Sequence, residues 1–243
     1  MRGEWRVTDR SEHRILDARR QSSGEHRWPA AVAVVTAIAL YAFLSDPLVV
    51  GPRYVVPVLG GLLLIPLVAV NPHRMSREVR PARIASIVLV VLLVAANMSS
   101  LVRLIVALLD GKQKGAGLLL GALQVWLTNI IVFGLAFWEL DRGGPVRRTQ
   151  QDRDRMPAAD FRFTHDENAA AVREVAATSS ELSGWVPQFV DYLYVSLTNS
   201  SAFSPTDTMP LSTRAKCLMG FQSLTAFVIS VLVIARAVSL IGT

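Results

Sequence analysis

The sequence predicts an all-α, polytopic membrane protein with about five transmembrane helices and one short re-entrant helix. Three observations predict this fold. The 243-residue chain is 51% hydrophobic, and its apolar residues gather into long blocks with almost no charge, as bilayer-spanning helices require. The charged residues, 18% of the chain, lie mostly between these blocks. A short helical stretch near the C-terminus is followed by a loop rich in Ser and Thr and then by a last apolar run.

The first four apolar blocks predict a four-helix transmembrane region over residues 28–140. Proline and glycine residues between the blocks favour turns at those positions. Arg103 lies inside the third block and has two interpretations: it snorkels to the membrane interface, or it is a functional charge within the membrane. The four blocks are residues 28–44, 54–70, 84–109 and 117–140.

The basic segments predict the orientation of the chain. The net charge is +6 and the sequence pI is about 10.1. Seven arginines lie in the polar N-terminal segment 1–27, four between residues 71 and 83, and seven in the polar connector 141–184. The positive-inside rule places all three segments, and so the N-terminus, in the cytoplasm of a multi-pass protein of the plasma or inner membrane. An anionic bilayer is the expected partner of this charge, and nucleic acid is not.

Residues 185–243 predict a unit of short helix, loop and last spanning helix. The short helix, Val186 to Asn199, has Pro187 in its first turn. Roughly twelve residues reach only ~18 Å of the ~30 Å hydrocarbon core. A re-entrant helix fits this length. Non-helical backbone at membrane depth occurs where it is buried in protein or lines water, so the loop is a candidate pore lining. The helix C-terminus favours a cation there, and Asp207 adds negative charge at the mouth.

Two groups of residues form the candidate pore. The first is the filter-like loop after the short helix. The second is a set of residues at helical spacing along one face of the last apolar run, residues 217–235. A plainer alternative is a hairpin that only packs, with Gln222 hydrogen-bonded to Gln124, Thr128 or Asn129 of a neighbouring helix. The filter-like residues are Ser201, Ala202, Phe203, Ser204, Pro205, Thr206 and Asp207, and the pore-facing residues are Gln222, Thr225, Ile229 and Val233.

This unit resembles the pore module of potassium channels, which has a pore helix, a Thr-Val-Gly-Tyr-Gly-Asp filter, a Pro and an inner helix. Residues 201–210 align to that pattern without gaps: Asp207 stands at the Asp and Pro210 at the Pro, Ser201 stands at a Thr position of the family directly before the motif written above, and Lys216 matches a basic residue near the start of the inner helix. The resemblance covers residues 185–241 and implies a homotetramer that conducts a monovalent cation. The C-terminal unit is also similar to uncharacterised bacterial polytopic membrane proteins, a resemblance that implies no function.

The chain departs from the potassium-channel pattern at the filter glycines. Ser204 and Thr206 replace them, and Pro205 has a fixed φ and no N–H. A pore with this loop is therefore expected to be poorly selective and lined by side chains. The charge rule would also make the short helix start from the cytoplasm, opposite to potassium channels but similar to ionotropic glutamate receptors.

Rival functions have weaker sequence support. His165-Asp166-Glu167 is the only His and acid cluster, and it fits a solvated face or a helix start better than a catalytic site. The sequence has no phosphate loop, metal-ligand spacing or nucleophile motif, so no enzyme activity, catalytic residue, metal or cofactor is expected. A secondary transporter is expected to have two similar halves with broken helices, and the sequence does not show such halves. The alternative to a channel is a non-conducting scaffold or regulatory subunit that binds a partner through residues 141–184, whose arginines are expected to form a solvated basic run.

Overall fold

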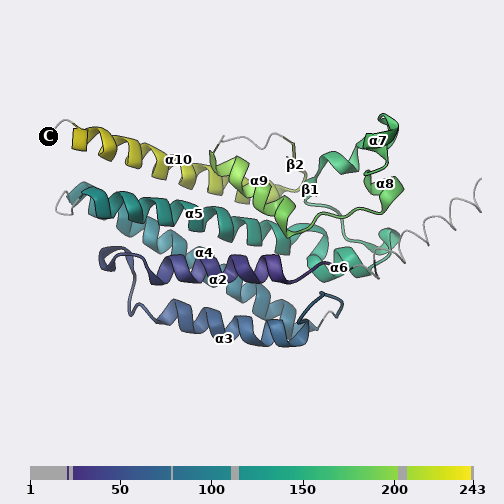
Figure 1. The fold of residues 1–243 in the computed structure, drawn as a ribbon, viewed down its shortest axis with the longest axis horizontal. Helices are drawn as coiled ribbons and strands as arrows, with labels where there is room; N and C mark the ends of the chain where they lie inside the picture. The colour runs from purple at the N-terminus through teal and green to yellow at the C-terminus, as the bar shows by residue number, and fades with distance from the viewer. Residues whose placement is uncertain (1–20, 22–23, 78, 111–114, 202–206, 242–243) are drawn as a thin grey trace, which may run out of the picture.

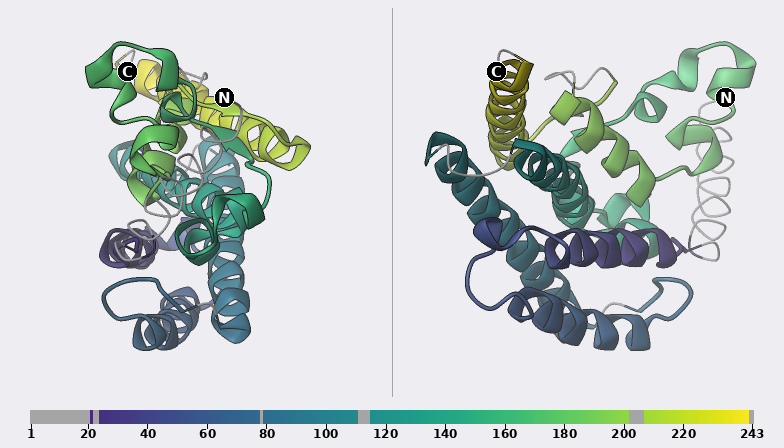
Figure 2. Two further views of the ribbon diagram at one scale, coloured as in Figure 1. Left: turned by 90° about the vertical axis from the view of Figure 1, so that its right-hand side faces the viewer. Right: turned by 60° about the vertical axis from the view of Figure 1, so that its left-hand side comes forward.

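The computed structural model describes residues 21, 24–77, 79–110, 115–201 and 207–241. These residues form an all-α fold, as the sequence predicts, with five long helices that extend along the molecule in Figure 1 and cross one another at an angle in Figure 2. A shorter sixth helix, α9 (Phe189–Ser201), packs between two of them. The long helices are α2 (Trp28–Ala42), α3 (Val55–Val70), α4 (Arg80–Asp110), α5 (Gly115–Leu140) and α10 (Thr213–Ile241).

Three helical segments in the described part of the chain are long and apolar enough to cross a membrane: Arg80–Asp110, Gly117–Gly143 and Thr213–Arg236. The other two apolar helices, α2 and α3, have 15 and 16 residues, which at 1.5 Å per residue reach only ~24 Å. The structure is therefore that of a helical protein with three candidate spans. The expected count of five spans stays a prediction.

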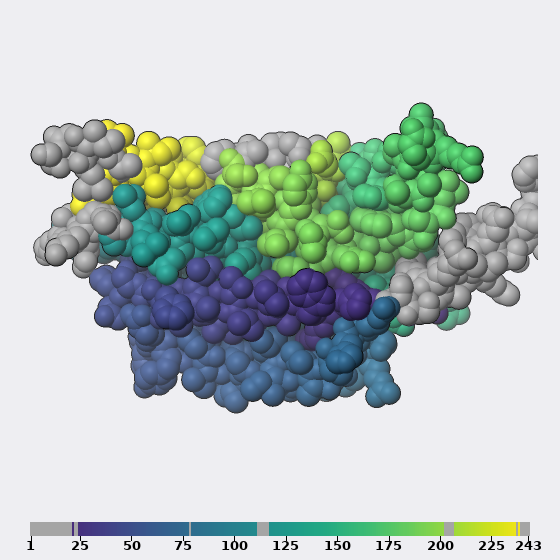
Figure 3. Space-filling model, in the orientation of Figure 1, coloured from purple at the N-terminus to yellow at the C-terminus, as the bar shows by residue number. Residues whose placement is uncertain are grey.

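The helices pack around α5. The side chains of Val132, Phe133, Leu135 and Phe137 are wholly buried there, because α2, α4, α9 and α10 all contact this helix. The outer faces of the bundle are apolar, with exposed Leu, Ile, Val and Phe side chains along α3, α4 and α10. In the space-filling view α2, α3 and α9 form one broad face (Figure 3). Apolar side chains outside suit a lipid environment.

The connector folds against one end of the bundle (Figures 1 and 3). Its strand β1 (Phe161–Arg162) pairs antiparallel with β2 (Met209–Pro210), with Phe161 opposite Pro210. The remaining elements are short turns of helix. They are η1 (Asp46–Leu48) at the far end and, in the connector, η2 (Asp141–Gly143), α6 (Pro145–Gln150), η3 (Arg153–Arg155), η4 (Thr164–Asp166), η5 (Asn168–Ala170), α7 (Arg173–Ala176) and α8 (Ser180–Ser183).

The connector arginines are only partly solvated. Arg142 and Arg148 are buried, so the expectation of a solvated basic run is wrong at these two positions. Their guanidinium groups form ion pairs, Arg142 with the half-buried Asp166 and Arg148 with the buried Glu25, which compensates the lost hydration of the buried cations. Arg103, by contrast, is exposed, and its Nε donates to the carbonyl of Pro47 in the α2–α3 connection at 2.7 Å. That contact agrees with the snorkelling interpretation.

One glycine sets how closely α9 approaches α5. A Cβ at Gly134 would lie 3.2 Å from the Cα of Leu193. We expect Gly134→Val to lower stability by about 1–3 kcal/mol through overpacking. Gly220, in α10, has nothing within 4 Å of its Cβ position, so Gly220→Val is the matched control. The measurement is the melting temperature of the detergent-solubilised protein by fluorescence-detected size-exclusion chromatography. Equal melting temperatures would contradict the close approach.

Candidate functional site

The short helix α9 begins three residues later than the sequence predicts. The backbone N–H of Gln188 donates to the Asp191 carboxylate at 2.7 Å, which is half of a capping box. The next N–H, that of Phe189, donates to Oε1 of Glu25 at 2.6 Å. A carboxylate at this position satisfies an otherwise unpaired donor and interacts favourably with the positive end of the helix. These two acids therefore define where α9 starts.

The segments on either side of α9 lie at the same end of the bundle (Figure 1). Trp185, before α9, packs edge-on against Phe163, with ring centroids 5.7 Å apart. After α9 the chain returns to β2, which pairs with β1 directly beside Phe163. The hydroxyl of Tyr194 also donates to the carboxylate of Asp207 at 3.4 Å. The segments that flank the 13-residue helix, Trp185 before it and Asp207 to Pro210 after it, therefore lie near one another.

A network of uncharged polar side chains joins α9 to α10. Gln222 is 0% exposed, and its Nε2 donates to the carbonyl and hydroxyl oxygens of Ser196 and to the hydroxyl of Ser200. Its Oε1 accepts from Nδ2 of Asn199 at 2.9 Å. Ser196 in turn donates to the carbonyl of Ile130 in α5 at 2.6 Å. Interhelical bonds of this kind hold helices together where apolar surface alone gives no preference.

A second polar group continues the network toward α4. Oδ1 of Asn129 accepts long contacts from Asn97 at 3.4 Å and from Thr225 at 3.5 Å. Two buried atoms here, Nδ2 of Asn129 and the hydroxyl of Ser100, have no hydrogen-bond partner within the described part of the chain. A buried donor without a partner costs about 1–3 kcal/mol. The centre of the bundle is therefore polar and only partly satisfied.

The residues of the sequence-predicted pore are divided between the interior and the surface. Gln222, Thr225 and Ile229 are buried against neighbouring helices, and Val233 is half-buried. The expected partners of Gln222 are wrong: it bonds to α9, and Asn129 contacts Thr225 instead. Among the filter-like residues, Ser201 and Asp207 are exposed, while Ala202, Phe203, Ser204, Pro205 and Thr206 lie outside the described residues. Their role as a pore lining stays a prediction.

A charged cluster at the connector end holds the start of α9 in place. Glu25 is 4% exposed and Arg148 is 0% exposed; their charged groups are 3.3 Å apart. The Trp138 indole also donates to Glu25, and Arg148 donates to the Trp138 carbonyl. Burial raises the pKa of the Glu25 carboxyl, and the attraction of Arg148 only partly opposes this effect. The guanidinium lies over the ring of Tyr192, 4.8 Å from its centroid.

Asp141 extends this cluster to the connector. Its wholly buried carboxylate accepts from the Tyr192 hydroxyl at 2.5 Å and from the backbone N–H of Asp160 at 2.6 Å. Asp160 forms an ion pair with Arg214 at 2.6 Å, at the start of α10. The ends of α5, α9 and α10 are therefore fixed to one another by carboxylates.

This charged cluster was not predictable from the sequence. Glu25 and Arg148 are 123 residues apart in the chain, and no local pattern links them. The one sequence feature that hints at a buried charged cluster is the pair of acids, Glu139 and Asp141, directly at the end of an apolar block. The His165-Asp166-Glu167 cluster is structural: Asp166 binds Arg142 at 2.7 Å and caps η4, which fits the predicted helix start. The described residues contain no group of three or more side chains placed to hold a metal.

Comparison with models of protein families, with curated proteins and with solved structures found no match to this chain.

Removal of the buried guanidinium tests the charged cluster. We expect Arg148→Met to destabilise the protein by about 3–5 kcal/mol, because Glu25 is left as an uncompensated buried charge. Glu25→Gln should cost less, since the amide oxygen still accepts from Phe189 and Trp138. The double variant should recover part of the loss. Arg155→Met, at an exposed arginine of the same segment, is the control. Thermal melting in detergent measures all four, and equal effects of Arg148→Met and Arg155→Met would refute the cluster's role.

Proposed function

We propose that the chain is an integral multi-pass membrane protein whose residues 185–243 form a potassium-channel-like pore module. In this proposal α9 is a re-entrant helix, residues 201–207 form the constriction, and α10 is the last spanning helix. Four copies surround a path that conducts monovalent cations with poor selectivity. The observation that carries the proposal is the return of the chain after α9 to β1, at the end of the bundle from which α9 starts.

The arrangement of the other helices supports a five-span count. The helices α2 and α3 lie lengthwise beside the three longer ones (Figure 1), and their apolar side chains face outward. Contacts join the segment before α2, the α3–α4 connection and the segment after α5: the backbone N–H of Met75 donates to the carbonyl of Glu25, and Arg148 binds the Glu25 carboxylate. These three segments are the arginine-rich ones, and they lie at the same end of the bundle. The positive-inside rule therefore favours a cytoplasmic position for that end.

The chemistry at the end of α9 supports a cation path. Its last turn carries Asn199, Ser200 and Ser201, and the partial negative charge of a helix C-terminus favours a cation beside it. Asp207 is exposed and supplies a carboxylate from each copy. The α10 stripe contacts α9 and α5 within one chain, so we propose that the loop forms the constriction. Gln222, Thr225, Ile229 and Val233 would line the path only in a state in which α9 moves away from α10.

A different observation favours the second candidate function, a non-conducting scaffold or regulatory subunit. Around α7 and α8 the connector exposes apolar side chains, including Val172 at 62% and Leu182 at 55%. Exposed apolar groups outside a bundle end are typical of protein interaction sites. This function predicts no conductance of the reconstituted protein at any salt concentration.

Neutralisation of the Asp207 carboxylate, at the mouth of the proposed pore, tests the channel proposal. We expect Asp207→Asn to lower cation conductance in planar bilayers, most strongly at low salt, because the Debye length grows from about 8 Å at 0.15 M to about 30 Å at 0.01 M. Asp154→Asn removes another exposed carboxylate, in the connector, and should leave conductance unchanged. The permeability ratio of K⁺ to Na⁺ should be near one. Strong K⁺ selectivity, or no conductance in the unaltered protein, would contradict the proposal.

Cysteine labelling tests the orientation. Single cysteines at Asp154, in the connector, and at Leu109, near the end of α4, are placed in a Cys217→Ser background, since Cys217 is exposed. We expect a membrane-impermeant maleimide to label position 109 but not position 154 in intact cells. Permeabilised cells should show both labelled. The reverse pattern would restore the polarity of ordinary potassium channels.

A further inference from the structure

The helix α9 is joined to α5 and to α10 by different chemistry. Against α5 the contact is close and largely apolar: a Cβ at Gly134 would lie 3.2 Å from the Cα of Leu193. The rings of Trp138 and Phe189 pack edge-on in the same joint, with centroids 5.9 Å apart, and the Ser196 hydroxyl adds a bond to a carbonyl of α5. Separation of α9 from α5 would expose this apolar surface to water, which is unfavourable.

The joint between α9 and α10 carries a run of polar bonds. Nδ2 of Asn199 donates to the carbonyl of Met219 at 3.0 Å and to Oε1 of Gln222 at 2.9 Å. Nε2 of Gln222 lies 3.0 Å from the carbonyl oxygen of Ser196, 2.6 Å from its hydroxyl oxygen and 2.8 Å from the hydroxyl oxygen of Ser200. Gln222 thus takes part in four of the five hydrogen bonds that the described residues form between these two helices.

Water can replace the bonds between α9 and α10, whereas it cannot replace the apolar contacts between α9 and α5. Interhelical hydrogen bonds in membrane proteins are individually weak, and a bridging water is nearly as good a partner as a direct one. Nδ2 of Asn129 is buried without a hydrogen-bond partner in the described part of the chain, and the Thr225 hydroxyl reaches its Oδ1 only at 3.5 Å. Water that enters as α9 and α10 separate would therefore gain partners beyond those of Gln222.

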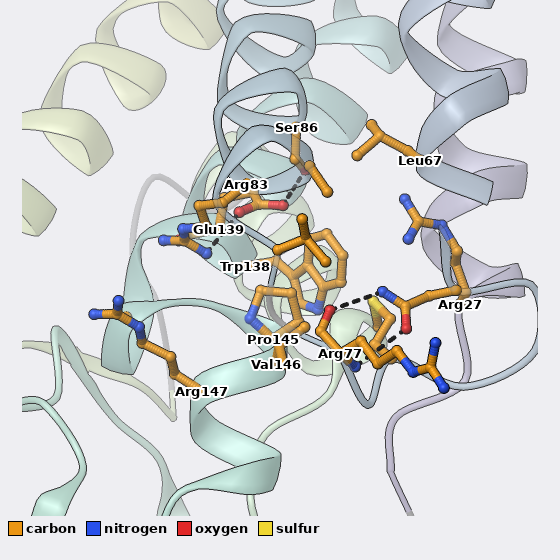
Figure 4. Close-up of a pocket in the computed structure, with 15 residues that line it drawn as sticks. Arg27, Leu67, Arg77, Arg83, Ser86, Trp138, Glu139, Pro145, Val146 and Arg147 are labelled. Atoms are coloured by element: carbon orange, nitrogen blue, oxygen red, sulfur yellow. Dashed lines mark hydrogen bonds and ion pairs between the residues drawn. The ribbon is translucent and has the colours of Figure 1, made fainter. Parts of the chain in front are cut away.

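Ionic contacts hold the helices together at the connector end. Figure 4 shows Arg83 and Ser86 of α4 converging on Glu139 at the end of α5, with the Arg83 guanidinium 3.0 Å from Oε2. Glu25 fixes the start of α9 at the same end, and the ion pair of Arg214 fixes the start of α10. The two helices are therefore free to separate only further along, where Gln222 joins them.

We propose that Gln222 is the latch of an opening between α9 and α10 that fills with water. In the closed state its amide holds the two helices together. In the open state the helices separate beyond their fixed starts, water replaces the partners of the amide, and α9 stays on α5. This inference rests on the proposed pore module, because the opening brings Gln222 and Thr225 to the cation path. Its test measures access of water, so access without conductance would refute the channel and leave the latch.

Cysteine labelling of the full chain in nanodiscs tests the latch. The reporter is Met219→Cys, at a residue that is 4% exposed one turn before Gln222, in a Cys217→Ser background. Gln222→Leu leaves its partners on α9 unpaired and should speed labelling by a small water-soluble methanethiosulfonate about ten-fold, since several weak bonds are lost together. Ser230→Ala removes a hydroxyl that bonds within α10 and should leave the rate unchanged. An unchanged rate in Gln222→Leu would overturn the proposal.

A double variant distinguishes a latch from general loss of packing. Asn199→Leu combined with Gln222→Leu makes both sides of the joint apolar, so labelling at position 219 should return to the unaltered rate or below it. A second reporter, Ala37→Cys, lies at a residue that is 1% exposed in the apolar core and should stay unlabelled in every variant. The melting temperature reports folding. Labelling at position 37 in Gln222→Leu, or faster labelling of the double variant than of the single one, would identify loss of packing and overturn the proposal.

Discussion

The buried carboxylate of Glu25 is the interaction on which the arrangement of the chain depends. It accepts from Trp138, Arg148 and Phe189, which are 113, 123 and 164 residues away. A buried carboxylate is tolerated only when charge and hydrogen bonds compensate its lost hydration. Because its partners belong to α5, α6 and α9, that requirement brings the N-terminal segment, the connector and the short helix to one point.

The position of α9 determines the chemistry of the interior. With its first N–H fixed at Glu25, a helix of 13 residues reaches about 20 Å along the bundle. Its last turns carry serine and asparagine side chains that would be costly in hydrocarbon. They are satisfied by Gln222 of α10, and the Ser196 hydroxyl is satisfied by α5. The polar stripe on α10 is thus the complement of the polar end of α9.

The helices were predictable from the sequence, and the polar contacts were not. The first two helices begin within one residue of the expected positions, because uncharged runs bounded by proline and glycine are local signals. Other boundaries moved where a side chain caps a helix: Asp191 delays α9, and Ser212, which accepts from the Ala215 N–H, starts α10 at Thr213 instead of at residue 217. The burial of Arg148 depends on a partner 123 residues away, which no local pattern reports. The partners of Gln222 depend on how α10 is rotated relative to α9 and α5, which no local pattern reports either.

Buried charged side chains and buried uncharged polar side chains lie at different places along the bundle. The buried charged residues of the described chain, Glu25, Glu139, Asp141, Arg142, Arg148 and Asp160, all belong to the connector end. The interior network has only amides and hydroxyls. Charges deep in a membrane protein are costly even in pairs, whereas they remain near water at the connector end. In the proposed pore, a cation would meet the uncharged amide and hydroxyl groups of the described interior and the C-terminal end of α9. Such ligands distinguish ions by number and geometry, and without glycines to aim successive carbonyls they favour weak selectivity.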